Sequence, residues 1–405
     1  MIALQRVAAP LGGRAFRLLW LGQSISALGT ALQLIAVIWL VQERTDSAVA
    51  VAGVALSTLL PRIAFALLGG VVADRFSATG VMVWADTARA LSVFLLVGLL
   101  VLDIFSLPLL YALLIANAAA AALFDPAAAS IVPRLVPAEQ LQAANSVNRL
   151  TPQLAAVLGA PLAGALVAVT GPVPALTFNA ASFAVAAACT ALIPAGPSPT
   201  PSAARSSLLG DARAGLSYVT RHTWLWTLLV VDGLLGMAVG GPLTVALPVL
   251  ADRTFDAGAA GFGWLFASYG AGALLGALLA GIVPPLRRRG VIYCVSGLAQ
   301  APLICTIALA PFPTALVALG IVGLLNGFVE ILFLGLLQER VRGELLGRVM
   351  SIAALTAFGL QPLSQLLSGI IAERSGPAIL FIGAGSLLGF GALAGLAIPA
   401  LRRID

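Results

Sequence analysis

The chain has 405 residues, of which 60% are hydrophobic and only 9% are charged, and its mean hydropathy is +1.05. Soluble globular proteins carry about 25% charged residues, so this composition excludes a soluble fold and makes a lipid bilayer the solvent for most of the chain. All 22 basic residues are arginine. The lack of lysine excludes both a Walker-type phosphate-binding loop and Schiff-base chemistry.

Apolar runs between charged residues, prolines and glycines are long enough to cross a bilayer, which takes about 20 apolar residues. They predict twelve membrane-spanning helices at residues 16–41, 48–73, 80–102, 106–125, 143–169, 173–193, 223–250, 260–283, 290–310, 313–337, 347–372 and 376–400. We therefore predict an all-α membrane protein. It has an N-terminal six-helix half (1–193), a cytoplasmic linker with a surface amphipathic helix (194–222) and a C-terminal six-helix half (223–405).

The arginines are distributed unevenly between the two membrane faces that these spans define. Sixteen fall in segments on the face that holds both termini, and only Arg44, Arg253 and Arg374 fall on the other. Because arginine resists translocation, the arginine-rich face is predicted to be cytoplasmic. The net charge of +6 is therefore a feature of topology, and we predict no nucleic-acid partner.

The fifth and eleventh predicted spans resemble each other. One ungapped register superposes four pairs of residues, which are Ser146 and Ser351, Gly164 and Gly369, Gly171 and Gly376, and Pro172 and Pro377. Both copies begin on the arginine-rich face. The pattern predicts a parallel repeat of six spans, related by an axis along the membrane normal.

Motifs for cofactors and metals are weak. The strings GAGALLG (residues 270–276) and GAGSLLG (residues 383–389) resemble a dinucleotide fingerprint, but each lies inside an apolar span with no preceding strand. Small-residue helix packing is the better interpretation. The cysteines Cys189, Cys294 and Cys305 lack CxxC spacing and are predicted to be packing residues. We therefore predict no cofactor and no metal.

The twelve spans, the two parallel halves, the polar connector and the segment GGVVADRF (residues 69–76) together resemble the major facilitator superfamily over essentially the whole chain. Residues 124–149, 210–222 and 86–91 look like the drug and siderophore exporter branch, which includes macrolide efflux and enterobactin exporters. The resemblance implies a transporter rather than an enzyme. It would work as a monomer by rocking two six-helix halves around a central site.

The branch has a signature between spans two and three, which reads G-x-L-A-D-R-x-G-R-R/K. Gly70, Ala73, Asp74 and Arg75 match it, whereas SATG (residues 77–80) stands where glycine and the basic residues are expected. The corresponding segment of the second half lacks the Asp-Arg pair and carries three arginines at residues 287–289.

The same resemblance implies a cytoplasmic gate. Asp86 and Arg89 lie one helical turn apart in span three, about 9–14 Å from its cytoplasmic start. Asp125 is predicted to end span four on that side. We predict that a charge cluster holds the two halves together in the outward-open state. Its members are Asp74, Arg75, Asp86, Arg89 and Asp125. Alternatively, Asp86 and Arg89 only neutralise each other for membrane insertion.

Span five contains a weakened form of the antiporter signature G-P-x-x-G-G. It appears as APLAGA (residues 160–165), preceded by Gly159, so two of the glycines are alanines. Small residues still permit close helix packing. We predict a helix bend at Gly159, Pro161 and Gly164.

In this superfamily, spans one, four, seven and ten line the central cavity. The candidate cavity residues of these spans are Gln23, Ser26, Thr30, Gln33, Asn117, Asp232, Asn326 and Glu330. The four residues of span one share a single helical stripe. The alternative for the uncharged residues is interhelical hydrogen bonding. Arg62, near the middle of span two, either pairs with an acid or binds an anionic substrate group.

Asp232 and Glu330 carry carboxyl groups about 13 Å inside their spans. A charge at mid-helix costs roughly 2.5–3.5 kcal/mol, so it needs a partner, a cavity or a proton. We predict that one of them is the proton-coupling site and attracts a cationic substrate; the alternative is a structural role. His222, the only histidine, lies outside the spans, which excludes a histidine relay.

These observations predict a secondary active exporter in the cell membrane, driven by a proton gradient because no ATP-binding motif is present. The expected substrate is a small amphipathic organic molecule, since the cavity helices are mostly apolar; drug, macrolide and siderophore classes follow from the resemblance alone. Two alternatives are a lipid or lysolipid transporter and a non-transporting membrane scaffold or sensor.

Overall fold

The computed structural model describes residues 9–194, 216–284, 286–402 and 404. The side chains of residues 66–75, 343, 344 and 358 also lie outside this description. The chain separates into two compact units. The first consists of Met1–Thr45 and Gly53–Ser202, and the second of Asp46–Ala52 and Ala203–Asp405.

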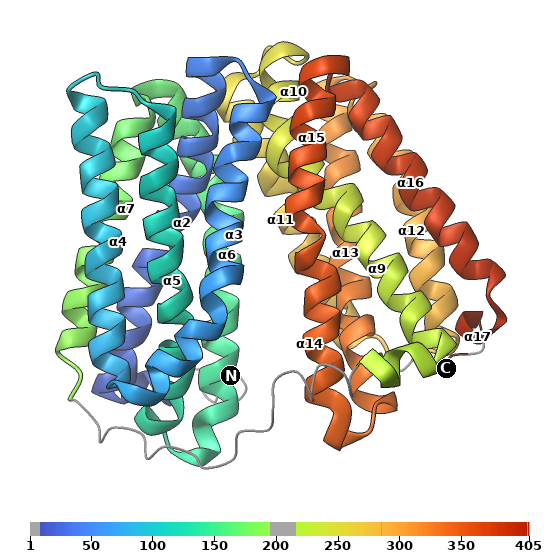
Figure 1. Ribbon diagram of the computed structural model, residues 1–405, viewed down its shortest axis with the longest axis horizontal. Helices are drawn as coiled ribbons and strands as arrows, with labels where there is room; N and C mark the ends of the chain where they lie inside the picture. The colour runs from blue at the N-terminus through green and yellow to red at the C-terminus, as the bar shows by residue number, and fades with distance from the viewer. Residues whose placement is uncertain (1–8, 195–215, 285, 403, 405) are drawn as a thin grey trace. The chain divides into compact units, whose positions relative to one another are not determined.

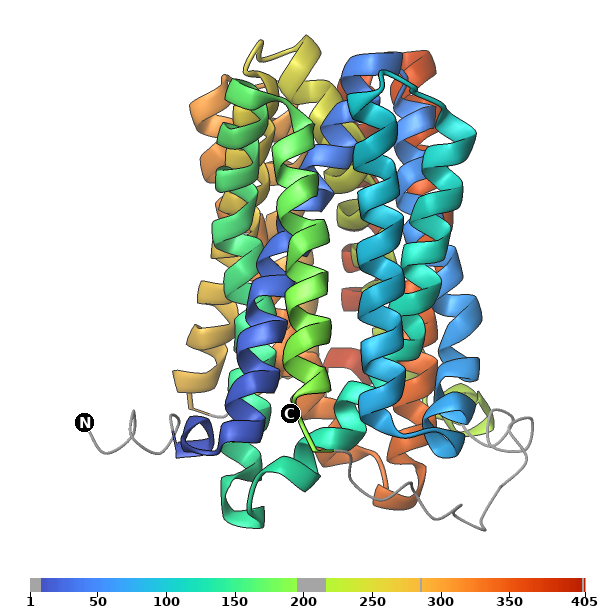
Figure 2. The same ribbon diagram turned by 90° about the vertical axis from the view of Figure 1, so that its left-hand side faces the viewer.

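The described elements are helical throughout (Figure 1). From the N-terminus to the connector they are η1 (Ala9–Gly12), α2 (Arg14–Thr45), α3 (Ala48–Arg75), α4 (Ala78–Val101), α5 (Leu107–Leu135), η2 (Ala138–Gln140), α6 (Leu141–Thr170) and α7 (Pro172–Ala191). In the first unit, α7 packs against both α2 and α4, and α4 packs against α5. Figure 2 shows α7 and α4 side by side.

The helices after the connector form the second unit. They are α9 (Thr223–Gly241), η3 (Pro242–Ala246), α10 (Leu247–Arg253), α11 (Gly258–Ile282), α12 (Arg289–Ile307), α13 (Phe312–Arg340), α14 (Gly343–Gly359), α15 (Gln361–Ser375), α16 (Pro377–Ala397) and α17 (Pro399–Arg402). Here α16 packs against α9 and α12, and α12 packs against α13. Residues 216–221 are also helical. The rest of the predicted surface helix lies outside the described residues.

Twelve helical stretches of the described chain are long and apolar enough to cross a membrane, and they correspond one to one with the predicted spans. The all-α membrane fold is thus confirmed. The prediction that span four ends at Asp125 is wrong, because α5 continues for ten more residues to Leu135. Pro126 follows the charge and resembles a terminator, but the apolar residues Ala127, Ile131 and Val132 remain buried. Neighbouring helices make a proline tolerable inside a span.

An internal repeat is seen at the helix junctions that the alignment superposed. Gly171 (φ 76°) lies between α6 and α7, and Gly376 (φ 85°) lies between α15 and α16. Both φ values are in the left-handed region that favours glycine, and a proline begins the next helix in each case. The packing repeats too, since α2 contacts α6 and α7 as α9 contacts α15 and α16.

Helices α11 and α13 approach each other closely through glycines. The residues are Gly272 and Gly276 of α11 and Gly323 and Gly327 of α13. A Cβ atom at any of these positions would overlap the backbone of the opposite helix. These are two facing small-xxx-small surfaces, the typical device for close helix packing in membranes. The packing interpretation of the string at residues 270–276 is therefore confirmed.

The seventh span changes its helical hydrogen bonding at its centre. The α-helix α9 ends at Gly241, and η3 is a π-helical turn that begins at Pro242. The Ser364 hydroxyl of α15 accepts a hydrogen bond from the Gly241 amide (3.1 Å) and donates one to the Met237 carbonyl (2.7 Å). These two backbone groups are four residues apart and would bond each other in a regular α-helix. Ser364 therefore ties both groups to α15 at the point where α9 gives way to the π-helical turn.

The eleventh span is also interrupted, at Leu360 between α14 and α15. Pro362 stands in the first turn of α15, where a missing amide proton costs nothing. The span predicted at residues 347–372 is confirmed as one membrane-crossing stretch, and it consists of two helices. Ser364 lies one turn beyond this break, so the breaks in the two spans lie close together.

We expect Ser364→Ala to lower the thermal stability of the purified protein. The change removes both hydrogen bonds to α9, and interhelical hydrogen bonds in membranes are worth about 0.6–1.7 kcal/mol. Thermal unfolding in detergent measures the effect. Ser368→Ala is the matched control, because Ser368 is equally buried on the same helix but makes no hydrogen bond that the structure describes. Equal melting temperatures for the two variants would contradict a stabilising role for these two hydrogen bonds.

Candidate functional site

The first unit contains a buried ion pair on α4. Arg89 Nη1 lies 3.3 Å from Asp86 Oδ1, and the two side chains are 11% and 0% exposed. The Arg89 guanidinium also stacks on the Phe183 ring of α7, with 3.9 Å from Cζ to the ring centroid. Phe183 therefore covers the arginine, and the two buried charges compensate each other.

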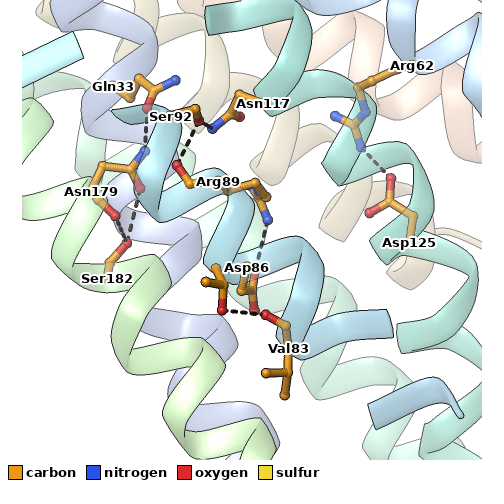
Figure 3. Close-up of polar contacts among 11 residues, drawn as sticks. Gln33, Arg62, Val83, Asp86, Arg89, Ser92, Asn117, Asp125, Asn179 and Ser182 are labelled. Atoms are coloured by element: carbon orange, nitrogen blue, oxygen red, sulfur yellow. Dashed lines mark hydrogen bonds and ion pairs between the residues drawn. The ribbon is translucent and has the colours of Figure 1, made fainter. Parts of the chain in front are cut away.

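A second ion pair joins α3 and α5 (Figure 3). Arg62 Nη2 lies 2.6 Å from Asp125 Oδ2, and both side chains are more than half exposed. Both residues also act electrostatically on Arg89. Of the two roles left open for Arg62, the structure shows pairing with an acid. Asp125 belongs to this pair, about 15 Å before the end of α5, and not to the end of its span.

The remaining members of the predicted gate cluster are Asp74 and Arg75. Their side chains lie outside the described residues, so this cluster stays a prediction. The loop that follows is described: the Ser77 hydroxyl accepts a hydrogen bond from the Gly80 amide (3.2 Å) and caps the N-terminus of α4. The SATG segment thus has a structural role of its own, as a helix cap in place of the basic residues of the family signature.

The polar stripe of α2 lies in more than one environment. Ser26 and Gln33 are buried, Gln23 is half-buried and Thr30 is exposed. Gln33 Oε1 accepts a hydrogen bond from Asn179 Nδ2 of α7 at 2.5 Å, and Figure 3 shows these two side chains pointing toward each other. Gln33 therefore contributes to the packing of α2 on α7, whether or not the stripe also faces substrate.

Two further candidate amides form interhelical hydrogen bonds. Asn117 of α5 donates to the Ser92 hydroxyl of α4 at 3.3 Å, and Asn326 of α13 donates to the Tyr269 hydroxyl of α11 at 2.9 Å. Both observations fit the alternative role, in which uncharged polar residues join neighbouring helices. Their assignment to a substrate cavity stays a prediction.

The predicted bend residues lie in the continuous helix α6. Gly159 and Gly164 are buried, and Pro161 lies inside the helix. A Cβ atom on Gly159 would come within 2.7 Å of the Ala31 Cβ of α2. Gly159 therefore permits the close approach of α6 to α2, and a bend at Pro161 stays a prediction.

The second unit brings two acids together with two tyrosines. Tyr293 of α12 donates a hydrogen bond from its hydroxyl to Asp232 Oδ1 of α9, at 2.5 Å. Glu330 of α13 acts electrostatically on Asp232, Tyr293 and Tyr269. Within the described part of the chain, neither carboxylate forms an ion pair with an arginine. The sequence-predicted proton sites thus form one cluster, which we call the acid pair, Asp232 and Glu330.

One of the three arginines at residues 287–289 pairs with an acid. Arg289 at the start of α12 lies 2.8 Å from Glu339 near the end of α13. Arg289 is nearly buried, whereas Glu339 is more than half exposed. This pair joins the ends of two adjacent helices, as the Arg62 and Asp125 pair joins two helices in the first unit.

Sequence reasoning missed the aromatic partners of these charges. Phe183 covers Arg89, and Tyr293 holds Asp232. A signal for Tyr293 was present, because the chain has only 4 tyrosines and a hydroxyl inside a span needs a partner. The Phe183 contact had no sequence signal, since phenylalanine is common in apolar spans.

Comparison with known proteins then places the chain in a family. A family model described as transmembrane secretion effector, of the major facilitator type, matches residues 6–405. The chain belongs to the major facilitator superfamily. This facilitator protein is accordingly a multi-pass membrane transporter and not an enzyme.

Several relatives of this transporter cover nearly its whole length. Macrolide efflux protein A of Streptococcus pyogenes is 26% identical over 409 residues, which span 96% of this chain and 97% of the relative. The multidrug efflux pump Tap of Mycobacterium tuberculosis is 28% identical over 410 residues, which span 97% and 95%. An uncharacterized MFS-type transporter of Sinorhizobium fredii is 33% identical over 276 residues, which span 67% and 66%.

Solved structures share the fold. The nucleoside transporter NupG matches with a TM-score of 0.72 at 15% identity, over 95% of this chain and 98% of that one. A bacterial homologue of the iron transporter ferroportin, in an inward-facing state, also matches with a TM-score of 0.72, at 17% identity over 95% and 99%. At such low identity these matches show the fold alone.

Proposed function

We propose that this transporter exports small amphipathic organic cations in exchange for protons, as a monomer and without a cofactor. The observation that carries the proposal is the acid pair of the second unit, in which Glu330 acts electrostatically on the half-buried Asp232 and neither carboxylate has an arginine partner among the described residues. The relatives named for macrolide and multidrug efflux support export of amphipathic molecules. The arginine distribution supports cytoplasmic termini.

The chemistry of exchange follows from repulsion between the two carboxylates. Two negative charges near each other repel, so at least one proton or one cation is favoured there. A substrate cation that binds one carboxylate makes ionisation of the other less costly, and a proton can leave. Binding of one ligand therefore opposes binding of the other, which is the coupling that an antiporter needs.

Proteoliposomes containing the full-length protein test this function. We expect a pH gradient to drive transport of the hydrophobic cation tetraphenylphosphonium. We expect Glu330→Gln and Asp232→Asn each to reduce this flux at least about tenfold, because removal of one charge removes the competition between ligands. Glu339→Gln is the matched control, since Glu339 lies on the same helix and pairs with Arg289. It should retain most of the flux.

Two results would overturn the proposal. One is full pH-driven flux in both acid-pair variants. The other is cation flux that ignores the pH gradient in the unmodified protein, together with movement of fluorescent lipid between leaflets, which would favour the lipid transporter.

A further inference from the structure

The two carboxylates of the acid pair have different surroundings. Asp232 accepts the Tyr293 hydrogen bond at 2.5 Å, whereas Glu330 makes no hydrogen bond or ion pair that the structure describes. Tyr293 itself is only 3% exposed. Its ring lies 6.1 Å from that of Phe333 on α13, measured between centroids. The hydroxyl is therefore held in place by packing, while Glu330 keeps its oxygens available.

Few other groups act on this hydrogen bond. The titratable groups that act on Asp232 are Tyr293 of α12 and Glu330 of α13. Cys294 and Glu330 also act on Tyr293. Tyr293 and Cys294 are neutral at physiological pH, so Glu330 is the only neighbour in this set that brings a charge. The state of Glu330 and the bond from Tyr293 together decide how Asp232 behaves.

A tyrosine suits a carboxyl group that changes its protonation state. The hydroxyl donates to an ionised carboxylate, and the same oxygen can accept a hydrogen bond from a protonated carboxyl group. The Tyr293 and Asp232 contact can therefore persist in both states by reversing its donor. This holds the Asp232 carboxyl group in one position while its proton comes and goes, at no cost in lost hydrogen bonds.

From this geometry we infer that Tyr293 is a positioning residue for proton exchange at Asp232, and that Glu330 is the acid that takes the substrate cation. The inference rests on the proposed function. It assigns the proton to Asp232 and the substrate cation to Glu330. Tyr293 does not contact the substrate in this scheme. It acts through Asp232.

Tyr293→Phe tests the inference, because it removes one hydroxyl and keeps the buried ring. We expect the affinity for tetraphenylphosphonium to stay within about twofold, since Glu330 is intact. We expect pH-driven flux to fall about tenfold and its pH midpoint to shift, since the hydrogen bond to a charged group is lost. Tyr111→Phe, the same change in a span of the first unit, serves as the control. It should leave affinity and pH midpoint unchanged.

A double variant and a spectrum separate positioning from a general structural role. Tyr293→Phe added to Asp232→Asn should cause no further loss of flux, because Tyr293 acts through Asp232. In infrared difference spectra across a pH jump, the carboxyl band that Asp232→Asn removes should move in Tyr293→Phe. This readout needs no transport, so it can support the positioning role even where the flux assay contradicts the proposed function.

The outcomes that would overturn the inference are equally definite. They are an unchanged carboxyl band and pH midpoint in a folded Tyr293→Phe protein, or a further loss of flux in the double variant. A large loss of tetraphenylphosphonium affinity in Tyr293→Phe would place the hydroxyl in the substrate site instead.

Discussion

Replacing Gly276 of α11 by leucine is expected to prevent the second unit from folding. A Cβ atom at Gly276 would overlap the backbone carbonyl of Leu324 on α13. Inserting extra atoms into a packed core costs about 1–3 kcal/mol when side chains can yield. Here the obstacle is a backbone, so α11 and α13 would have to separate along their whole contact. We expect a cost above that range and loss of monodisperse protein in size-exclusion chromatography.

A control for this experiment lies on the same helix. Gly281 near the end of α11 has nothing within 4 Å of the position that a Cβ would occupy. Gly281→Leu should therefore give normal yield and a melting temperature close to that of the unmodified protein. If Gly276→Leu folded as well as Gly281→Leu, the close approach of α11 and α13 would be wrong.

Replacing Arg89 by alanine is expected to cause the largest loss of stability in the first unit. The change leaves the carboxylate of Asp86, which is 0% exposed, without its positive partner. Removing one member of a buried pair costs about 3–5 kcal/mol, because the other charge remains desolvated. The contact with the Phe183 ring is lost as well. Thermal unfolding of the purified protein should show a strongly lowered melting temperature.

Two further variants show whether the loss of stability comes from the unpaired buried charge. Asp86→Asn combined with Arg89→Gln should recover part of the lost stability, because no uncompensated charge remains. Arg44→Ala should change stability by about 1 kcal/mol or less, since its pair with Asp103 is exposed at a helix end. If the double variant is stable and transports normally, the pair serves only to neutralise charge. If it is stable but transports poorly, the gate hypothesis gains support.

Much of the fold could be predicted because membrane spans are a local property of the chain. Every apolar run that the sequence contains became a helix, and the glycine and proline at residues 171–172 and 376–377 ended and began helices as the repeat required. Two helix boundaries near prolines were not predicted. Span four was predicted to end at Asp125, but α5 continues past Asp125 and Pro126; the span predicted at residues 347–372 was correct as one membrane-crossing stretch, but the helix break before Pro362 was not predicted. A proline can thus lie inside a continuous helix or in the first turn of a new one, and the packing of neighbouring helices decides between the two.

The candidate site was predictable in its residue types and not in its partners. Acids and an arginine inside apolar spans are conspicuous, so Asp86, Arg89, Asp232 and Glu330 could be singled out. Which residues pair with one another could not be predicted, because the partners are far apart in the sequence. Asp125 pairs with Arg62, which is 63 residues away, and Asp232 pairs with Tyr293, which is 61 residues away.

Three properties could be predicted from the sequence by itself. The protein lies in a membrane, its twelve spans have the positions given above, and its two halves repeat. These follow from hydropathy and from backbone constraints of glycine and proline, which act over a few residues. The tertiary structure alone decided which charges meet. A hydrogen bond reaches only about 3 Å, so its partners depend on which helices touch and at what height, and the packing of whole helices sets both.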